Sequence, residues 1–383
     1  MLTLERTGVS LGSGIGSPAL VPDVHKIAVL RANGLGDFIV ALPALEALRA
    51  AYPRADIALL AKDWQVGFLS GRPGPVDRVI VVPPVRGISV AEDGPEGEER
   101  AIEEFFATMR AEHFDLAIQL HGGGRNSNPF VRRLGARVTA GLKTPDAVAL
   151  DRWIPYNLYQ PEILRYCEVM SLVGALPRTL APGISVTPRD LAESLRVVPP
   201  TDKPLVAIHP GATDPRRWWP PESFARVADA LACAGAELAI IGTDVERRSV
   251  EGVLGAMSAP AWDTSGQLSL GGLAGLLSRC RMVVGNDSGP LHLAQAVGAA
   301  TVGIYWAYNL MNYGPFTRSR HHPLVSWCLD CPVCHRRLVG ASCEHRVSLV
   351  TEVAVEDVRT AALDLFHATA DEQTRGVLLS SLP

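Results

Sequence analysis

The chain has 383 residues, which is more than one ordinary hydrophobic core needs and suits two domains of roughly 100–200 residues each. Hydrophobic residues make up 47% and charged residues 20%, a balance typical of globular proteins and unlike that of disordered or collagen-like chains. The 36 lysines and arginines against 40 aspartates and glutamates give a net charge of −4, which argues against a nucleic-acid partner.

The beginning of the sequence has none of the features of a targeting segment. No basic stretch followed by an apolar run opens it, and no apolar run approaches the roughly 20 residues of a membrane span. We therefore expect residues 1–25, rich in Gly and Ser, to form a flexible segment of a cytoplasmic protein. In that reducing compartment the seven cysteines are expected to be free or metal-bound.

Residues 26–180 predict a first domain of alternating strands and helices. Strand-like apolar runs occupy residues 26–31, 56–61, 78–82 and 115–120. Leu42, Leu45 and Leu48 follow helical spacing after the first run, and a second helix is predicted over residues 102–113. Alternating strands and helices indicate an α/β domain with a parallel sheet.

A Pro-rich, polar stretch over residues 181–203 predicts a linker, after which the alternation restarts in residues 204–360. Strands are predicted at the start of 205–212, over 237–243, at the start of 281–290 and over 300–306. Helices are predicted over 222–235, 245–257, 270–280 and 291–298. Two Rossmann-like halves joined by a linker predict the GT-B architecture, followed by a C-terminal helix and tail over residues 361–383.

The turn Asn33-Gly34-Leu35-Gly36-Asp37 follows the first predicted strand. Ligands of open α/β sheets bind at the carboxyl ends of strands, and glycines in such a turn allow a sharp bend and close backbone approach. Asp37 is predicted at the start of the next helix, where it either caps free backbone amides or takes part in chemistry.

Two further turns lie in the second half. His209-Pro210-Gly211-Ala212-Thr213 precedes Arg216 and Arg217, which either bind a phosphate or are solvated on a surface loop. The turn Gly285-Asn286-Asp287-Ser288-Gly289 opens a helix, whose N-terminal amides would face a phosphate. Asp287 would repel that phosphate and is expected to accept hydrogen bonds from sugar hydroxyls. Together these turns predict a cradle for a nucleoside diphosphate.

Three segments also resemble those of a known family. KIAVLRANGLGDFIVALPALEALRAAYPRADIALLA, HPGATDPRRWWPPESF and GNDSGPLHLAQAVGAATVGIYW are similar to glycosyltransferase family 9, the ADP-heptose heptosyltransferases. The likeness runs from about residue 26 to residue 360, with the motifs in the family's order. It implies an inverting transfer of heptose or a related sugar from an ADP-sugar to an acceptor hydroxyl.

The resemblance implies roles for the motif residues. In the family the aspartate of the Gly-Leu-Gly-Asp turn is the general base, which is Asp37 here. Donor-binding residues are placed at His209, Gly211, Ala212, Thr213, Arg217, Glu246, Asp287, Ser288, Gly289 and His292. Acceptor-side residues are placed at Asn33, Gly34, Gly36, His121 and Arg125. Relatives often work at the inner membrane face, so peripheral attachment there is compatible with this assignment.

The sequence departs from the family at three places. Arg217 stands where the family commonly has a lysine, so a planar fork replaces a point charge. Glu246 is the nearest match to the acidic residue that contacts the nucleoside in relatives. Residues 119–130 resemble the acceptor-side loop but contain an unusual run of glycines. The acceptor is therefore left open between a glycan, a protein and a small molecule.

The mechanism implied by the family is a single displacement, in which a carboxylate accepts the acceptor hydroxyl's proton. The leaving diphosphate would be stabilised by Arg217 and helix N-terminal amides. No Asp-x-Asp pair of the kind that holds a catalytic divalent metal occurs in the sequence, so metal-independent catalysis is expected. Two alternatives stay open: a GT-B nucleotide-sugar epimerase, and a non-catalytic nucleotide-sugar-binding protein.

Four cysteines are clustered within residues 328–345: Cys328, Cys331, Cys334 and Cys343. Closely spaced Cys-x2-Cys pairs are typical of tetrahedral thiolate sites, and some protein-modifying relatives carry an iron or zinc finger in this region. The spacing predicts a structural zinc or iron, the alternative being a loop of free thiols. The remaining Cys167, Cys233 and Cys280 lie in apolar helical patterns and are predicted to be core residues.

Overall fold

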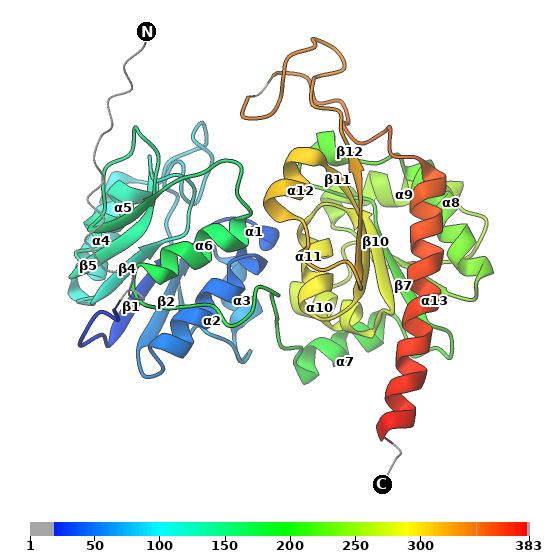
Figure 1. Cartoon of the computed structure of the whole chain (residues 1–383), viewed down its shortest axis with the longest axis horizontal. Coiled ribbons are helices and arrows are strands. Elements are labelled where there is room, and N and C mark those ends of the chain that lie inside the picture. The colour runs from blue at the N-terminus through cyan, green and yellow to red at the C-terminus, as the bar shows by residue number, and fades with distance from the viewer. Residues whose placement is uncertain (1–18, 342, 381–383) are drawn as a thin grey trace.

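The computed structural model describes residues 19–341 and 343–380, which form two α/β units lying side by side (Figure 1). Residues 1–18 of the predicted flexible segment 1–25 and residues 381–383 of the predicted tail lie outside the described residues. In the described part of this segment Val21 is buried and its amide donates to Tyr52 Oη at 3.0 Å, whereas Leu20 is 51% exposed.

The first unit is built on six parallel strands in the order β3-β2-β1-β4-β5-β6. They are β1 (Lys26–Leu30), β2 (Asp56–Ala61), β3 (Arg78–Val81), β4 (Leu116–Gln119), β5 (Val138–Lys143) and β6 (Arg152–Pro155). Ile27 and Val29 belong to one core cluster, whereas Ala28 and Leu30 belong to another. Successive side chains point to opposite faces, so both faces of the sheet are covered, which explains the continuous apolar runs in the sequence.

Six helices accompany these strands. They are α1 (Leu35–Ile39), α2 (Leu42–Ala51), α3 (Trp64–Leu69), α4 (Glu99–Ala111), α5 (Ser127–Arg133) and α6 (Glu162–Ser171). Helix α2 starts at Leu42, as its leucine spacing predicts, and Pro43 stands in its first turn. Proline is tolerated there because the amide it lacks would have no partner within the helix.

The second unit has six parallel strands in the order β12-β11-β10-β7-β8-β9. They are β7 (Leu205–His209), β8 (Glu237–Ile240), β9 (Trp262–Asp263), β10 (Met282–Asn286), β11 (Ala300–Trp306) and β12 (His321–Ser326). The α-helices of this part are α7 (Pro188–Val197), α8 (Pro221–Cys233), α9 (Arg247–Ala256), α10 (Leu270–Arg279), α11 (Gly289–Ala296), α12 (Ala307–Tyr313) and α13 (Val355–Ser380). Short 3-10 turns cover Pro215–Arg217 and Asp244–Glu246. The α/β prediction and its two-part arrangement are confirmed.

Both sheets have the same connectivity. In each unit the first strand lies beside the fourth, so β1 neighbours β4 and β7 neighbours β10. The strand order reverses at these neighbours, and the crevice outside the carboxyl ends of such strands is the usual ligand site of an open α/β sheet. Helices α1 and α11, which follow the turns at these crevices, pack against each other between the units (Figure 1).

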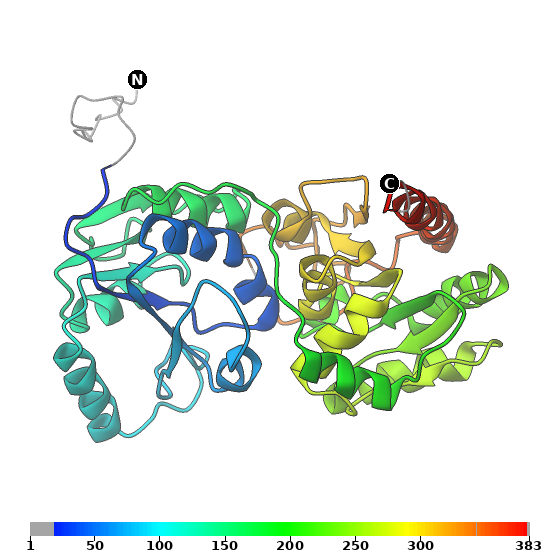
Figure 2. The same ribbon diagram turned by 90° about the horizontal axis from the view of Figure 1, so that it is seen from below.

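The predicted linker 181–203 contains α7, which packs against α10 of the second unit. Figure 2 shows the chain crossing between the units just before this helix. A bidentate ion pair joins α7 to the first unit: Arg72 Nη1 and Nη2 lie 2.7 and 3.2 Å from the two carboxylate oxygens of Asp190. The side chains of Arg72 and Asp190 are only 3% and 6% exposed, so this pair is almost fully desolvated.

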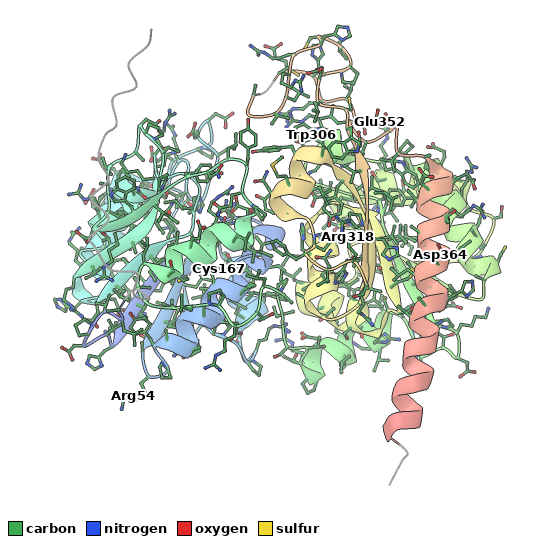
Figure 3. The ribbon with its side chains drawn as sticks, in the orientation of Figure 1. Arg54, Cys167, Trp306, Arg318, Glu352 and Asp364 are labelled. Carbon is green, nitrogen blue, oxygen red and sulfur yellow. The ribbon has the colours of Figure 1, made fainter. Side chains whose placement is uncertain are left out.

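Two of the three predicted core cysteines are buried. Cys167, labelled in Figure 3 on α6, and Cys280 are enclosed, and burial raises the pKa of their thiols to about 11 and about 12. The prediction for Cys233 is wrong, because this residue is exposed at the last position of α8. The C-terminal helix begins at Val355, before the predicted residue 361, and packs against α8 and β11.

Candidate active site

A cleft of about 1080 Å³ is lined by residues from both units. The first unit contributes the turn after β1, and the second unit contributes the turns after β7 and β10. Sequence-predicted residues that line it are Gly34, Gly36, Asp37, His209, Ala212, Thr213, Arg217, Glu246, Asp287, Ser288, Gly289 and His292. The structure therefore brings the proposed base and most of the proposed donor-binding residues to one cavity.

Asp37 lies in the first turn of α1 with a side chain that is 28% exposed. Its Oδ1 atom accepts hydrogen bonds from Arg31 Nη2 at 3.0 Å and from Tyr313 Oη at 3.3 Å. Its Oδ2 atom accepts only from the Gly34 amide at 3.2 Å among the described residues. The two carboxylate oxygens are thus unequal, and Oδ2 has more free capacity for a ligand.

Arg31 is buried directly behind this turn. Its Nη1 donates to Leu120 O at 2.7 Å and its Nε donates to the backbone oxygen of Asp37 at 3.0 Å. His121 Nδ1 accepts a hydrogen bond from the Ala32 amide at 3.4 Å. Burial lowers the pKa of His121 to about 3, so its ring is neutral. These contacts fix the turn from behind and leave its front open to the cleft.

The two donor-side turns are tied together by Asn286 at the end of β10. Its Nδ2 donates to Pro210 O at 2.7 Å and its Oδ1 accepts the Trp219 amide at 3.1 Å. Trp218 Nε1 donates to Ala212 O at 2.7 Å. The turn after β7 and the Arg-Trp-Trp segment therefore keep a fixed position relative to α11.

Asp287 is a buried carboxylate with three side-chain partners. Its Oδ2 accepts from Arg217 Nη1 at 3.3 Å and Asn309 Nδ2 at 2.6 Å, and its Oδ1 accepts from His292 Nε2 at 3.1 Å. Burial opposes ionisation, but His292, Arg217 and Asn309 outweigh it and lower the pKa of Asp287. Arg217 makes these contacts through Nη1, and no partner within the described chain occupies its Nη2, which remains available to a ligand.

His209 links the β7 turn to both Ser288 and Glu246. Its Nδ1 lies 3.0 Å from Ser288 Oγ, and the same hydroxyl lies 3.0 Å from Asn286 O. Its Nε2 lies 3.5 Å from Glu246 Oε1. Burial raises the pKa of Glu246, but His209 and the amide and hydroxyl of Thr243 outweigh that effect and lower it to about 2.

Gly211 does not line the cleft but stands directly behind Glu246. A Cβ atom at this position would lie 2.0 Å from Glu246 Oε1, which no real contact allows. Glycine is therefore required to let this acidic side chain pack against the His-Pro-Gly turn.

The Cys-rich segment gathers four metal-ligand atoms that differ in one member from the predicted set. Ligand atoms of Cys331, Cys334, Cys343 and His345 all lie within 4.8 Å of one another. Cys328 is not in this group, because its thiol donates to Asp330 O at 3.3 Å. A tight turn explains the difference: His335 has a φ of 56°, and its amide bonds to Cys331 O at 2.9 Å, which brings Cys334 back over Cys331.

This segment also forms part of the cleft wall. Leu338, Gly340 and Ala341 line the cleft, and a Cβ on Gly340 would contact Leu158 of the first unit at 3.2 Å. Trp306 Nε1 donates to Cys328 O at 2.8 Å, and Figure 3 shows Trp306 and Glu352 at the root of the segment. The Cys-rich segment is thus anchored on the second unit and reaches the first.

Some acceptor-side residues lie away from the cleft. Arg125 is paired with Asp146 on the surface with a side chain that is 69% exposed, and it does not line the cavity. Asn33 and His121 do not line the cleft either, and His121 is buried behind the turn.

Four residues of these two sites were not predicted from the sequence: Arg31, Asn309, Tyr313 and His345. An arginine directly after a buried strand and the Cys-x-His spacing of Cys343 were available signals for two of them. Asn309 and Tyr313 lie on α12, where no motif marks them.

A family profile described as "Glycosyltransferase family 9 (heptosyltransferase)" matches residues 102–335, more than half of the chain. The chain belongs to glycosyltransferase family 9. The resemblance seen in the three motifs is therefore confirmed, and the protein is a heptosyltransferase-like glycosyltransferase.

Relatives and solved structures agree with this family. A lipopolysaccharide heptosyltransferase 2 of Salmonella typhimurium is 27% identical over 299 residues, covering 73% of this chain and 82% of the relative. The structure of the E. coli ADP-heptose lipopolysaccharide heptosyltransferase II superposes with a TM-score of 0.68 at 19% identity, covering 89% and 98% of the two chains. This likeness confirms the GT-B fold.

A second similar structure is that of an iron-containing protein. The iron-containing dodecameric heptosyltransferase TibC of enterotoxigenic E. coli, in complex with ADP-D-beta-D-heptose, superposes with a TM-score of 0.50 at 12% identity. The match covers 95% of this chain and 80% of TibC.

As for membrane attachment, none of the helices in residues 19–341 and 343–380 has the length and apolar character of a membrane span.

Proposed function

We propose that this glycosyltransferase moves a heptose from ADP-heptose to an acceptor hydroxyl with inversion at the anomeric carbon. The observation that carries the proposal is the cleft itself: Asp37 on one wall faces the two donor turns on the other. ADP-heptose is favoured as donor because the structure is similar to that of an E. coli ADP-heptose heptosyltransferase. We assign the acceptor to residues 26–180 and the donor to residues 204–360.

Asp37 is proposed as the general base, acting through Oδ2. The acceptor oxygen attacks the anomeric carbon while its proton passes to Oδ2, and the bond from that carbon to the diphosphate oxygen breaks. The electron pair of that bond leaves with ADP. Because Arg31 and Tyr313 already bind Oδ1, Oδ2 is the oxygen that can take the proton without breaking a stronger contact.

The leaving diphosphate is proposed to lie between Arg217 and the N-terminus of α11. Helix α11 begins at Gly289, directly after Ser288, and Arg217, whose Nη1 donates to Asp287 O at 2.9 Å, can donate from its available Nη2 to a phosphate oxygen. Ala212 and Thr213 complete the diphosphate site, Glu246 suits nucleoside hydroxyls, and Asp287 suits sugar hydroxyls. These cationic and dipolar groups stabilise the leaving charge, so we propose that the transfer step needs no divalent metal.

We propose that the Cys-rich segment holds a structural zinc or iron ion. The residues fit such an ion: three sulfur atoms and one imidazole are the donors it prefers, and the buried Nδ1 of His345 has no hydrogen-bond partner. The amides of Cys334 and Val333 also lower the pKa of the Cys331 thiol to about 6, which favours the thiolate that a metal binds. With four protein ligands the ion would hold the cleft wall and take no part in transfer.

The test of the proposed base is Asp37→Asn. Asparagine keeps the shape of the side chain, but its one oxygen must serve Arg31, Tyr313 and the Gly34 amide, so some stability should be lost while ADP binding by the folded protein stays at the parental level. ADP release from ADP-heptose with heptose-deficient lipopolysaccharide as acceptor should fall about 10²–10⁴-fold, the usual contribution of a general base. Parental turnover in this variant would show that Asp37 only caps α1.

A further inference from the structure

Helix α12 is the part of the second unit that reaches the proposed base. Tyr313 at its last position donates to Asp37 Oδ1 at 3.3 Å. The preceding residue, Asn312, accepts a hydrogen bond from Arg165 Nη2 of α6 at 3.4 Å. Both contacts cross from the second unit to the first, so α12 is docked on the first unit at two neighbouring positions.

Tyr313 is itself held by the donor side of the cleft. Its ring lies 6.1 Å from the ring of His292, centroid to centroid, and His292 donates to Asp287. Burial, together with the charges of Asp37 and Glu162, raises the pKa of Tyr313 well above its ordinary value. The phenol therefore keeps its proton and acts as a donor throughout the pH range in which an enzyme of this kind is assayed.

Arg31 and Tyr313 bind the same oxygen of Asp37 but belong to different units. Arg31 holds Oδ1 from within the first unit whether or not the second unit is in contact. Tyr313 can do so only in the arrangement in which α12 touches α6 and α1.

We infer that Tyr313 is a positioning residue: it keeps Oδ2 of Asp37 turned toward the acceptor when the donor-bearing unit is docked. This inference rests on the proposed role of Asp37 as base. The Tyr313 hydrogen bond links the donor and acceptor halves. The Asp37 carboxylate has both of its Oδ1 hydrogen bonds only when the unit that carries the donor is docked and supplies the second one.

Other charged groups near Asp37 do not explain such an effect. Arg31 is fixed by Leu120 O and by the Asp37 backbone. Glu162 is paired with Arg165, and His121 is neutral. None of these contacts involves the Tyr313 hydroxyl, so removal of that hydroxyl alters one hydrogen bond to the base and leaves the surrounding charges in place.

The test is Tyr313→Phe, which removes the hydroxyl and keeps the ring against His292. We expect kcat, followed as ADP release from ADP-heptose with water and with heptose-deficient lipopolysaccharide as acceptors, to fall about three- to tenfold, as one modest hydrogen bond allows. The dissociation constant of ADP-heptose should stay within about twofold of the parent, because the hydroxyl faces the base. The acidic limb of the kcat profile should move to higher pH, since a carboxylate that loses a donated hydrogen bond holds its proton more tightly.

The matched control is Tyr159→Phe, the same change at a tyrosine that is 59% exposed, and it should behave as the parent. In the Asp37→Asn background, Tyr313→Phe should cause no further loss of kcat, because the two residues act as one unit. Two results would overturn the inference and leave the proposed base in place. One is that Tyr313→Phe lowers kcat in the Asp37→Asn background by the same factor as in the parent. The other is that Tyr313→Phe alone keeps the parental kcat and pH profile while Asp37→Asn is slow. Parental turnover of Asp37→Asn would instead overturn the proposed base, and the inference with it.

Discussion

Replacing Asp190 with asparagine removes one partner of the buried ion pair that joins α7 to the first unit. The parental carboxylate accepts two hydrogen bonds from Arg72 and one from the Thr187 amide at 2.8 Å, all at a side chain that is 6% exposed. Asparagine has one acceptor oxygen, so its amide group must face one of these donors. Arg72 would keep its charge in a site that is 3% exposed, without a countercharge.

The cost of this change can be worked out from that burial. Breaking a buried pair by removing one partner typically destabilises a protein by about 3–5 kcal/mol. At about 2–4 °C per kcal/mol for a domain of 150–250 residues, the melting temperature should fall by about 6–20 °C. Thermal unfolding followed by circular dichroism at pH 7 measures the shift.

The control is Glu104→Gln, which breaks an ion pair with Arg100 whose side chains are 66% and 86% exposed. An exposed pair of this kind contributes about 0.3–0.5 kcal/mol, so this variant should melt within about 2 °C of the parent. A melting temperature of Asp190→Asn equally close to the parent would refute the assumption that the Arg72 pair is desolvated.

The pH dependence of this effect has a definite sign. Burial raises the pKa of Asp190, but Arg72 and Thr187 outweigh it and lower the pKa below its unfolded value of about 3.9. A depressed carboxyl pKa contributes stability that is present above the unfolded value and is lost as the pH falls through the folded value. The difference in melting temperature between parent and Asp190→Asn should therefore shrink below about pH 4.

The other predictions concern the cleft. Arg217→Ala should weaken ADP binding about tenfold by calorimetry, and the loss should shrink in high salt as screening grows; an unchanged affinity would place the anion site elsewhere. Cys328→Ser should retain about one zinc or iron per chain by elemental analysis, whereas His345→Ala should lose much of it; the reverse would restore the four-cysteine set. Gly36→Ala places a Cβ atom 2.9 Å from His292 Cδ2 of the second unit, so the transfer rate should fall while ADP binding is kept. A parental transfer rate would show that the two units can separate enough to accommodate the added methyl group.

The fold was largely predictable because buried parallel strands are continuous apolar runs. Residues 300–306 coincide with β11, and β1, β2 and β10 also lie within predicted runs. β5, β6, β9 and β12 were missed. β6, β9 and β12 are edge strands with polar or half-buried residues, whereas β5 is interior and its apolar pattern is broken by Thr139 and Gly141.

Within the site, the turns were predictable because glycines and polar residues follow recognisable strands. Tyr313 was not, because its contact with Asp37 joins residues 276 positions apart and depends on how two units dock. His345 was missed for a related reason: the fold of the loop, rather than cysteine spacing alone, selects the fourth ligand atom.

The shared connectivity of the two sheets means that the molecule contains two crevices of the same topology, either of which could in principle attract a phosphate. Of the two helices that begin at these crevices, α1 and α11, only α11 has a first turn without an acidic residue. Asp37 lies in the first turn of α1, whereas the first turn of α11 has no acidic residue and the neighbouring Asp287 is paired with Arg217 and accepts a hydrogen bond from His292. A fixed carboxylate therefore takes the place of a phosphate in the first crevice. Under the proposed function, this difference would direct the charged diphosphate and the neutral hydroxyl to opposite walls before any reaction begins.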